Sequence, residues 1–107
     1  MIPIDKVKKI IERHISLEKE LSTGKIDPKL LAKKSKEYSD LKNILNSAKE
    51  YIEFEKNKKD LNNIISDKKN DNEMIVLAEK ELKDAEQKRE KNEKKLKIFL
   101  LPKDKDD

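Results

Sequence analysis

The chain has 107 residues, of which 34% are apolar and 47% are charged. This length allows at most one domain, and so few apolar residues exclude a thick globular core. Helices that share narrow apolar seams are the natural architecture for a composition rich in Lys, Glu, Leu, Ile and Asn. Disorder is the rival interpretation for so charged a chain, but the apolar residues recur at regular spacings.

The charge balance is weakly basic, with 27 basic and 23 acidic residues interleaved and a formal net charge of +4. Only Arg13 and Arg89 are arginines, whereas surfaces that read bases favour the bidentate Arg fork. The basicity therefore indicates either a bias in composition or weak contacts between lysines and phosphates.

Composition also excludes several chemistries. The chain has one Gly, one His and no Cys, so phosphate-binding glycine loops, zinc sites and nucleophile–His pairs are not expected. The longest apolar run, residues 74–78, is far shorter than the ~20 residues of a membrane span. We expect a cytoplasmic protein with no enzymatic activity, no cofactor, no small-molecule ligand and no membrane partner.

The first predicted helix covers about residues 4–21. Pro3 suits its first turn, and Asp5 complements the helix dipole. Its apolar stripe, with residues three or four apart, consists of Val7, Ile10, His14, Leu17 and Leu21, widened on one side by Ile4, Ile11 and Ile15. Gly24 is placed to end the helix with a left-handed residue.

The second predicted helix, about residues 28–66, is the longest element, and the others must pack along it. Asp27 and Pro28 form a strong start signal, because Asp accepts from free backbone amides and Pro lacks a donor. Its stripe includes Leu31 and changes phase near Ala48, which predicts a shift of contact face. The first helix is long enough to cover only the half before Ala48.

Residues 66–72 contain no apolar side chain, which predicts the tip of a hairpin. Either Asn70 or Asp71 could cap the next helix. This third helix, about residues 72–101, keeps a seven-residue apolar repeat, as expected for an antiparallel partner of the second helix. Pro102 stops it, and residues 102–107 form a charged exit segment.

The sequence thus predicts an all-α fold in a single helical domain, residues 1–107. We expect an antiparallel three-helix bundle at the end that holds both termini, continuing into a long two-helix coiled-coil hairpin. His14 should be packed with its ring nitrogens satisfied locally. Arg89 and Asn92 should set register in the seam, with the Arg head reaching solvent. Core packing, not base stacking, is expected for the aromatic residues Tyr38, Tyr51, Phe54 and Phe99.

Three stretches of the sequence match a known pattern. The run Lys34-Ser35-Lys36-Glu37-Tyr38-Ser39-Asp40-Leu41 closely resembles the S-K-E-Y-S-E-L run near the start of bacterial class I peptide chain release factors. Lys8-Lys9-Ile10-Ile11-Glu12-Arg13 is similar to the first helix of that family, and Leu100-Leu101-Pro102-Lys103-Asp104 to the L-L-P-K-D that ends its N-terminal domain. The last stretch resembles the type that reads UAA and UAG.

The resemblance implies the N-terminal helical domain of a release factor acting in translation termination. It implies docking on the ribosome, near protein and rRNA at the stalk base of the large subunit, and cooperation with the class II release-factor GTPase. The family's Gly-Gly-Gln loop and Pro-x-Thr element are absent from this chain, so no catalytic residue carries over.

Lys68, Lys69 and Asn70 at the predicted tip are the candidate partner-binding residues, because backbone and side chains there should be free of helix packing. Two alternatives remain open. One is a stand-alone helical-hairpin arm that binds RNA directly. The other is a coiled-coil module that pairs through apolar residues of the arm, namely Leu61, Ile64, Ile65, Ile75 and Val76.

Overall fold

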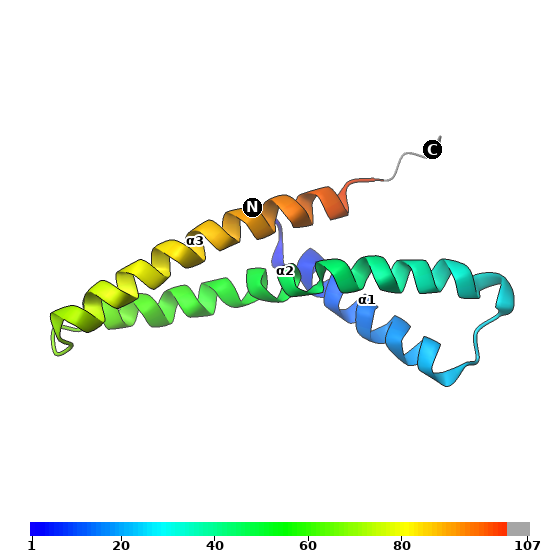
Figure 1. Ribbon diagram of the computed structural model, residues 1–107, viewed down its shortest axis with the longest axis horizontal. Coiled ribbons are helices and arrows are strands. Elements are labelled where there is room, and N and C mark those ends of the chain that lie inside the picture. Colours follow the sequence, from blue (N-terminus) through cyan, green and yellow to red (C-terminus); the bar gives the residue numbers. More distant parts are fainter. Residues whose placement is uncertain (103–107) are drawn as a thin grey trace.

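The computed structural model describes residues 1–102, which form three helices and no strand (Figure 1). They are α1 (Ile4–Thr23), α2 (Pro28–Ser66) and α3 (Asn72–Leu100). The molecule is elongated, with principal extents of 61 × 33 × 19 Å. The all-α class is confirmed. Residues 103–107 of the expected exit segment lie outside the described residues.

Both shorter helices pack on α2, as Figure 1 shows: α1 runs back along its first half, and α3 runs along its second half. All three helices meet only around the middle of α2, where the N-terminus also lies. The prediction placed this three-helix part at one end. It lies in the middle because α1 begins beside Tyr51, whereas the end of α3 reaches α2 near Leu41.

The core is a cluster of buried side chains at this junction. Its members are Ile2, Val7, Ile10, Leu17, Leu41, Ile44, Ala48, Tyr51 and Leu96. Tyr51 is 1% exposed, and its hydroxyl accepts a hydrogen bond of 3.1 Å from the backbone N–H of Ile2. Each fully buried aliphatic side chain contributes roughly 1.5–3 kcal/mol, so this small cluster is the main stabilising contact of the fold.

The contact face of α2 shifts as the sequence predicts. Its buried side chains continue from Leu41 and Ile44 through Ala48 to Tyr51 and Phe54. The two steps that follow Ala48 are both three residues long, which turns the buried face away from α1 and towards α3.

Two side chains expected on the apolar stripes are not covered. Ile15 of α1 is 47% exposed and Leu31 of α2 is 48% exposed. Leu31 lies in the first turn of α2, near the loop towards which α1 slants away from α2 (Figure 1). Ile15 lies between the buried His14 and Leu17, so its exposure comes from its place at the side of the stripe. Periodicity alone gives the face of each helix but not the angle at which two helices cross.

The helix ends follow local rules. Gly24 has φ 68°, the left-handed conformation that ends α1. The Asp27 carboxylate accepts a hydrogen bond of 3.0 Å from the N–H of Lys29 at the start of α2. Of the two candidate caps for α3, Asp71 is the one used, because its side chain accepts from the N–H of Met74 at 2.8 Å.

Candidate functional site

The tip of the α2–α3 hairpin is a turn held by Asp67. Its carboxylate accepts a hydrogen bond of 3.0 Å from the backbone N–H of Lys69, and its carbonyl accepts one of 3.1 Å from the N–H of Asn70. Lys68 and Lys69 are both exposed. The turn therefore presents two ammonium groups on an ordered backbone, which lowers the entropy lost when a partner binds.

Asn70 does not share this exposure. Its side chain is half-buried, and its amide donates a hydrogen bond of 3.0 Å to the carbonyl of Ile64. That carbonyl lies in the last turn of α2, where the helix leaves acceptors without partners. Asn70 therefore closes the turn, and the expectation that it is free of helix packing is wrong.

Apolar side chains lie next to the tip on α3. Met74 is 50% exposed, Val76 64% and Leu77 58%. Of the five arm residues considered for pairing of two chains, Leu61, Ile64, Ile65 and Ile75 are half-buried in the hairpin and Val76 is exposed. The hairpin covers most of that apolar surface itself.

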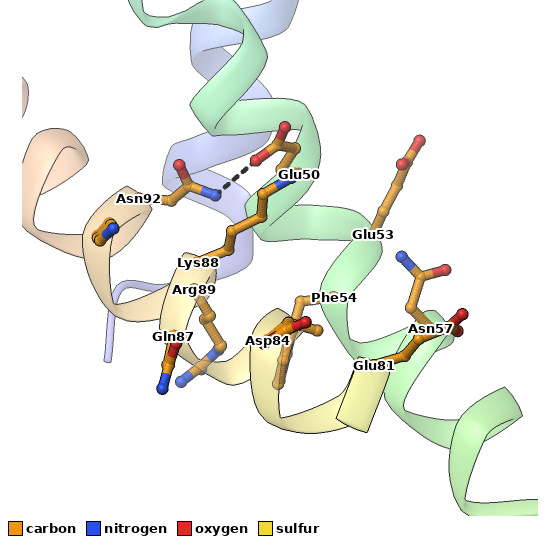
Figure 2. A pocket seen from close by; sticks show the side chains of 12 residues that line it. Glu50, Glu53, Phe54, Asn57, Glu81, Asp84, Gln87, Lys88, Arg89 and Asn92 are labelled. Atoms are coloured by element: carbon orange, nitrogen blue, oxygen red, sulfur yellow. Dashed lines mark hydrogen bonds between the residues drawn. The ribbon is translucent and has the colours of Figure 1, made fainter. Parts of the chain in front are cut away.

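An open groove of about 600 Å³ lies between α2 and α3, at the base of the arm (Figure 2). At its edge, the guanidinium carbon of Arg89 lies 5.1 Å from the ring centre of Tyr51 and 5.0 Å from that of Phe54. Asn92 is buried and donates a hydrogen bond of 3.0 Å to the carboxylate of Glu50, the dashed line in Figure 2.

These contacts correct the sequence prediction for Arg89. The side chain is only 22% exposed, so its head does not reach freely into solvent but stacks over two rings of α2. Cation–π contacts of this kind contribute about 0.5–2 kcal/mol each. Arg89 and Asn92 thus hold α3 against α2, as a register-setting role requires.

The charges around the groove nearly balance. Glu50, Glu53, Glu81 and Asp84 face Lys88, Arg89 and Lys91, and such a mixed lining selects neither an anion nor a cation. Within residues 1–102, no group of three or more His, Asp or Glu is placed to hold a metal ion. The groove is therefore the seam of the hairpin and not a ligand site.

The run 34–41 lies against α1. Glu37 forms a two-point ion pair with Arg13, with distances of 2.8 and 3.0 Å, and these hydrogen bonds raise the pKa of Arg13. Lys34 pairs with Glu20, and Leu41 is buried in the core. Four consecutive positions on one helix face, 34, 37, 38 and 41, therefore join α2 to α1.

His14 is the α1 partner of Tyr38. The two rings are stacked, with centres 4.8 Å apart and an angle of 18° between their planes. The packed position of His14, which is 8% exposed, is confirmed. The expected local hydrogen bonding of both ring nitrogens is not confirmed, because Nε2 is buried without a hydrogen-bond partner among the described residues.

A second groove, of about 780 Å³, lies where the end of α3 passes over α1 and α2. Ile10, Leu41 and Phe99 line it, and Lys6 and Asp40 stand at its charged rim. The apolar side chains at the end of α3 are open to solvent, with Ile98 70% and Leu101 63% exposed.

The fold is an elongated helical module, with a base at the three-helix junction and an arm whose tip presents two exposed lysines. None of the described helices has an apolar stretch long enough to cross a membrane. Comparison with known proteins specifies the class further.

The PCRF domain family matches residues 10–107. Peptide chain release factor 1 of Pelagibacter ubique (strain HTCC1062) is 52% identical over 107 residues, which cover 100% of this chain and 30% of that protein. The protein of the same name from Orientia tsutsugamushi (strain Boryong) is 42% identical over 99 residues, 92% of this chain and 27% of that protein. No solved structure matches.

The chain belongs to the peptide chain release factor family, through its PCRF domain. Another relative, peptide chain release factor 1 of Agathobacter rectalis, is 41% identical over 105 residues, which cover 96% of this chain and 29% of that protein. The chain thus spans under a third of the length of these curated relatives, and it corresponds to their N-terminal part.

Proposed function

We propose that the chain is the N-terminal, non-catalytic domain of a release factor that terminates translation at UAA and UAG in the cytoplasm. In this proposal, the domain docks the complete factor on the ribosome near the stalk base of the large subunit. It meets ribosomal protein and rRNA there, and it influences cooperation with the class II release-factor GTPase.

The docking role is supported by the length of the arm and by its small core. The arm is built from the second half of α2 and most of α3. Between Phe54 of α2 and Asn92 of α3, Ala78 is the only described residue that is buried. An extension with so little core does not stabilise the fold by itself. Its length is accounted for if the tip reaches a partner.

Lys68 and Lys69 are the contact residues in this proposal. Both ammonium groups are exposed on a turn that Asp67 orders, so they can meet phosphates or carboxylates without rearrangement of the backbone. Asn70 belongs to the same proposed contact surface, and its hydrogen bond to the carbonyl of Ile64 supports the turn.

Charge reversal at the tip tests the proposal in the complete factor. Lys68→Glu with Lys69→Glu should raise the factor concentration that gives half-maximal peptide release on ribosomes by about 3- to 30-fold, since rim charges act mainly on association. The maximal release rate should not change, because the chemistry lies elsewhere. The effect should weaken above about 0.3 M salt, where the Debye length falls below ~6 Å.

The matched control is Lys56→Glu with Lys59→Glu, which makes the same charge change at two exposed positions along the arm. This variant should release peptide like the unaltered factor, with and without the GTPase. If the tip variant matches the control at every salt concentration, the tip is not the docking surface.

A further inference from the structure

The end of α3 is apolar on opposite sides of the helix. Of residues 96–101 only Lys97 is charged, in a chain in which 47% of the residues are charged. Leu96 is 0% exposed and packs in the core with α1 and α2. Ile98 lies two residues further on, about half a turn, and so leaves the helix on the other side. A helix segment that is apolar all round is suited to cover from two sides, and within residues 1–102 only one side is covered.

The uncovered side chains border the second groove, of about 780 Å³, where α3 diverges from α2 towards its end (Figure 1). We call it the α3-end groove. Ile10 and Leu41, each 4% exposed, lie beneath it, and residues 98–101 form one side. Ile98 is 70% exposed and Leu101 63%. Apolar side chains that gather at an open groove in this way mark an interaction site.

The rim of the α3-end groove adds charge to this apolar surface. Lys6 and Lys9 of α1 line the groove and are exposed. Arg13 and Glu37, which also line it, already pair with each other at 2.8 and 3.0 Å. The groove therefore suits an amphipathic polypeptide segment, with apolar side chains for the groove and a carboxylate for the ammonium groups of α1.

A later segment of a longer chain is the occupant that best fits this position. The chain corresponds to the N-terminal part of its curated relatives and covers 30%, 27% and 29% of three of them. Leu101, next to the last described residue, itself lines the groove. A segment that follows is thus tethered beside the groove, at an effective concentration on the order of millimolar. A second copy of the chain or a separate protein lacks this advantage.

We propose that the α3-end groove is an interdomain docking site, which a segment following residue 107 covers in a complete release factor. The segment packs apolar side chains against Ile98 and Leu101, and it places a carboxylate beside Lys6 or Lys9. The proposal rests on the proposed function, because it requires the chain to be the N-terminal domain of a longer factor. Since the groove lies at the three-helix base, its occupant also fixes the direction in which the arm leaves the rest of the factor.

Cysteine labelling tests whether the groove is covered. The chain has no Cys, so Ile98→Cys and Leu101→Cys each introduce one thiol at the groove. Each variant is made in the chain of residues 1–107 and in the complete factor, and maleimide labelling of that thiol is followed by peptide mass spectrometry without ribosomes. Both thiols should react at least about 10-fold more slowly in the complete factor, because a covered thiol reacts only when the cover opens.

The matched controls are Val76→Cys and Leu77→Cys on the arm, since these side chains are 64% and 58% exposed. They should react in the complete factor within about 3-fold of their rates in residues 1–107, because they stay exposed. Equal rates for the groove thiols in the two proteins overturn the proposal. Slowing of the control thiols to the same extent also overturns it, because the protection is then not specific to the groove.

Two further measurements identify the occupant. If labelling of Ile98→Cys in residues 1–107 slows as the protein concentration rises from about 1 to 100 μM, a second copy covers the groove and the proposal is wrong. In the complete factor, p-benzoyl-phenylalanine placed at position 98 should crosslink to peptides beyond residue 107, whereas crosslinks confined to residues 1–107 overturn the proposal. Because neither measurement involves the ribosome or changes Lys68 and Lys69, failure here leaves the test of the tip unaffected.

Discussion

Leu96 brings α3 into the three-helix core, and truncating it tests that junction. The side chain is 0% exposed and is the α3 member of the buried cluster with α1 and α2. Leu96→Ala removes three carbon groups at about 0.8 kcal/mol each and leaves a cavity that neighbours fill only in part. We expect the free energy of unfolding to fall by about 2.5 to 4 kcal/mol, a large share of the 5–15 kcal/mol typical of a domain.

Urea titration followed by circular dichroism at 222 nm measures this loss. Leu77→Ala on the same helix is the matched control, because Leu77 is 58% exposed and its truncation should cost less than about 1 kcal/mol. Both variants should keep the denaturant slope of the unaltered chain. If the two truncations cost the same, α3 does not enter a shared core at Leu96, and the three-helix junction is refuted.

Three further predictions concern helix ends and pH. Gly24→Ala should cost about 1 kcal/mol, seen as a lower melting temperature, because φ is 68° and no atom lies within 4 Å of the added Cβ, so the cost is conformational. Asp71→Ala should cost about 1 kcal/mol in the same assay, since it removes the cap of α3. Hydrogen bonds from the N-terminal ammonium and Lys97 lower the pKa of Glu93 below its ordinary 4.5. The ionised carboxylate of Glu93 therefore stabilises the fold fully above pH 4.5, and this stabilisation is lost as the pH falls through the lower pKa of the folded state. Urea titrations from above pH 4.5 down through that pKa should show this loss of unfolding free energy in the unaltered chain and not in Glu93→Gln.

The helices and their ends were predictable because their signals are local. Gly24, Asp27 and Asp71 act on backbone groups within three residues, and a stripe three or four residues apart identifies the packed face of a helix. The family resemblance added the class of protein, since its three stretches lie in order along the chain.

The contacts that sequence reasoning missed depend on the path of a second helix. Arg89 was expected in solvent but stacks on Tyr51 and Phe54, because α2 places two rings where the guanidinium emerges. Asn70 was expected to be free but donates to Ile64, a bond that exists only once the turn is closed. The one available signal was the seam position of Arg89 beside two aromatic residues of the partner helix.

The run 34–41, which carries the strongest family resemblance, can be divided by what its side chains touch. Lys34, Glu37 and Tyr38 bind α1 through Glu20, Arg13 and His14, whereas Ser35, Lys36 and Ser39 are exposed. The first group explains three of the eight positions by folding alone, since these side chains fix α1 along the first half of α2. With that half braced, the second half of α2 is free to extend with α3 as the arm. A change at the tip, more than 25 residues along α2 from this brace, should therefore alter docking without unfolding the base.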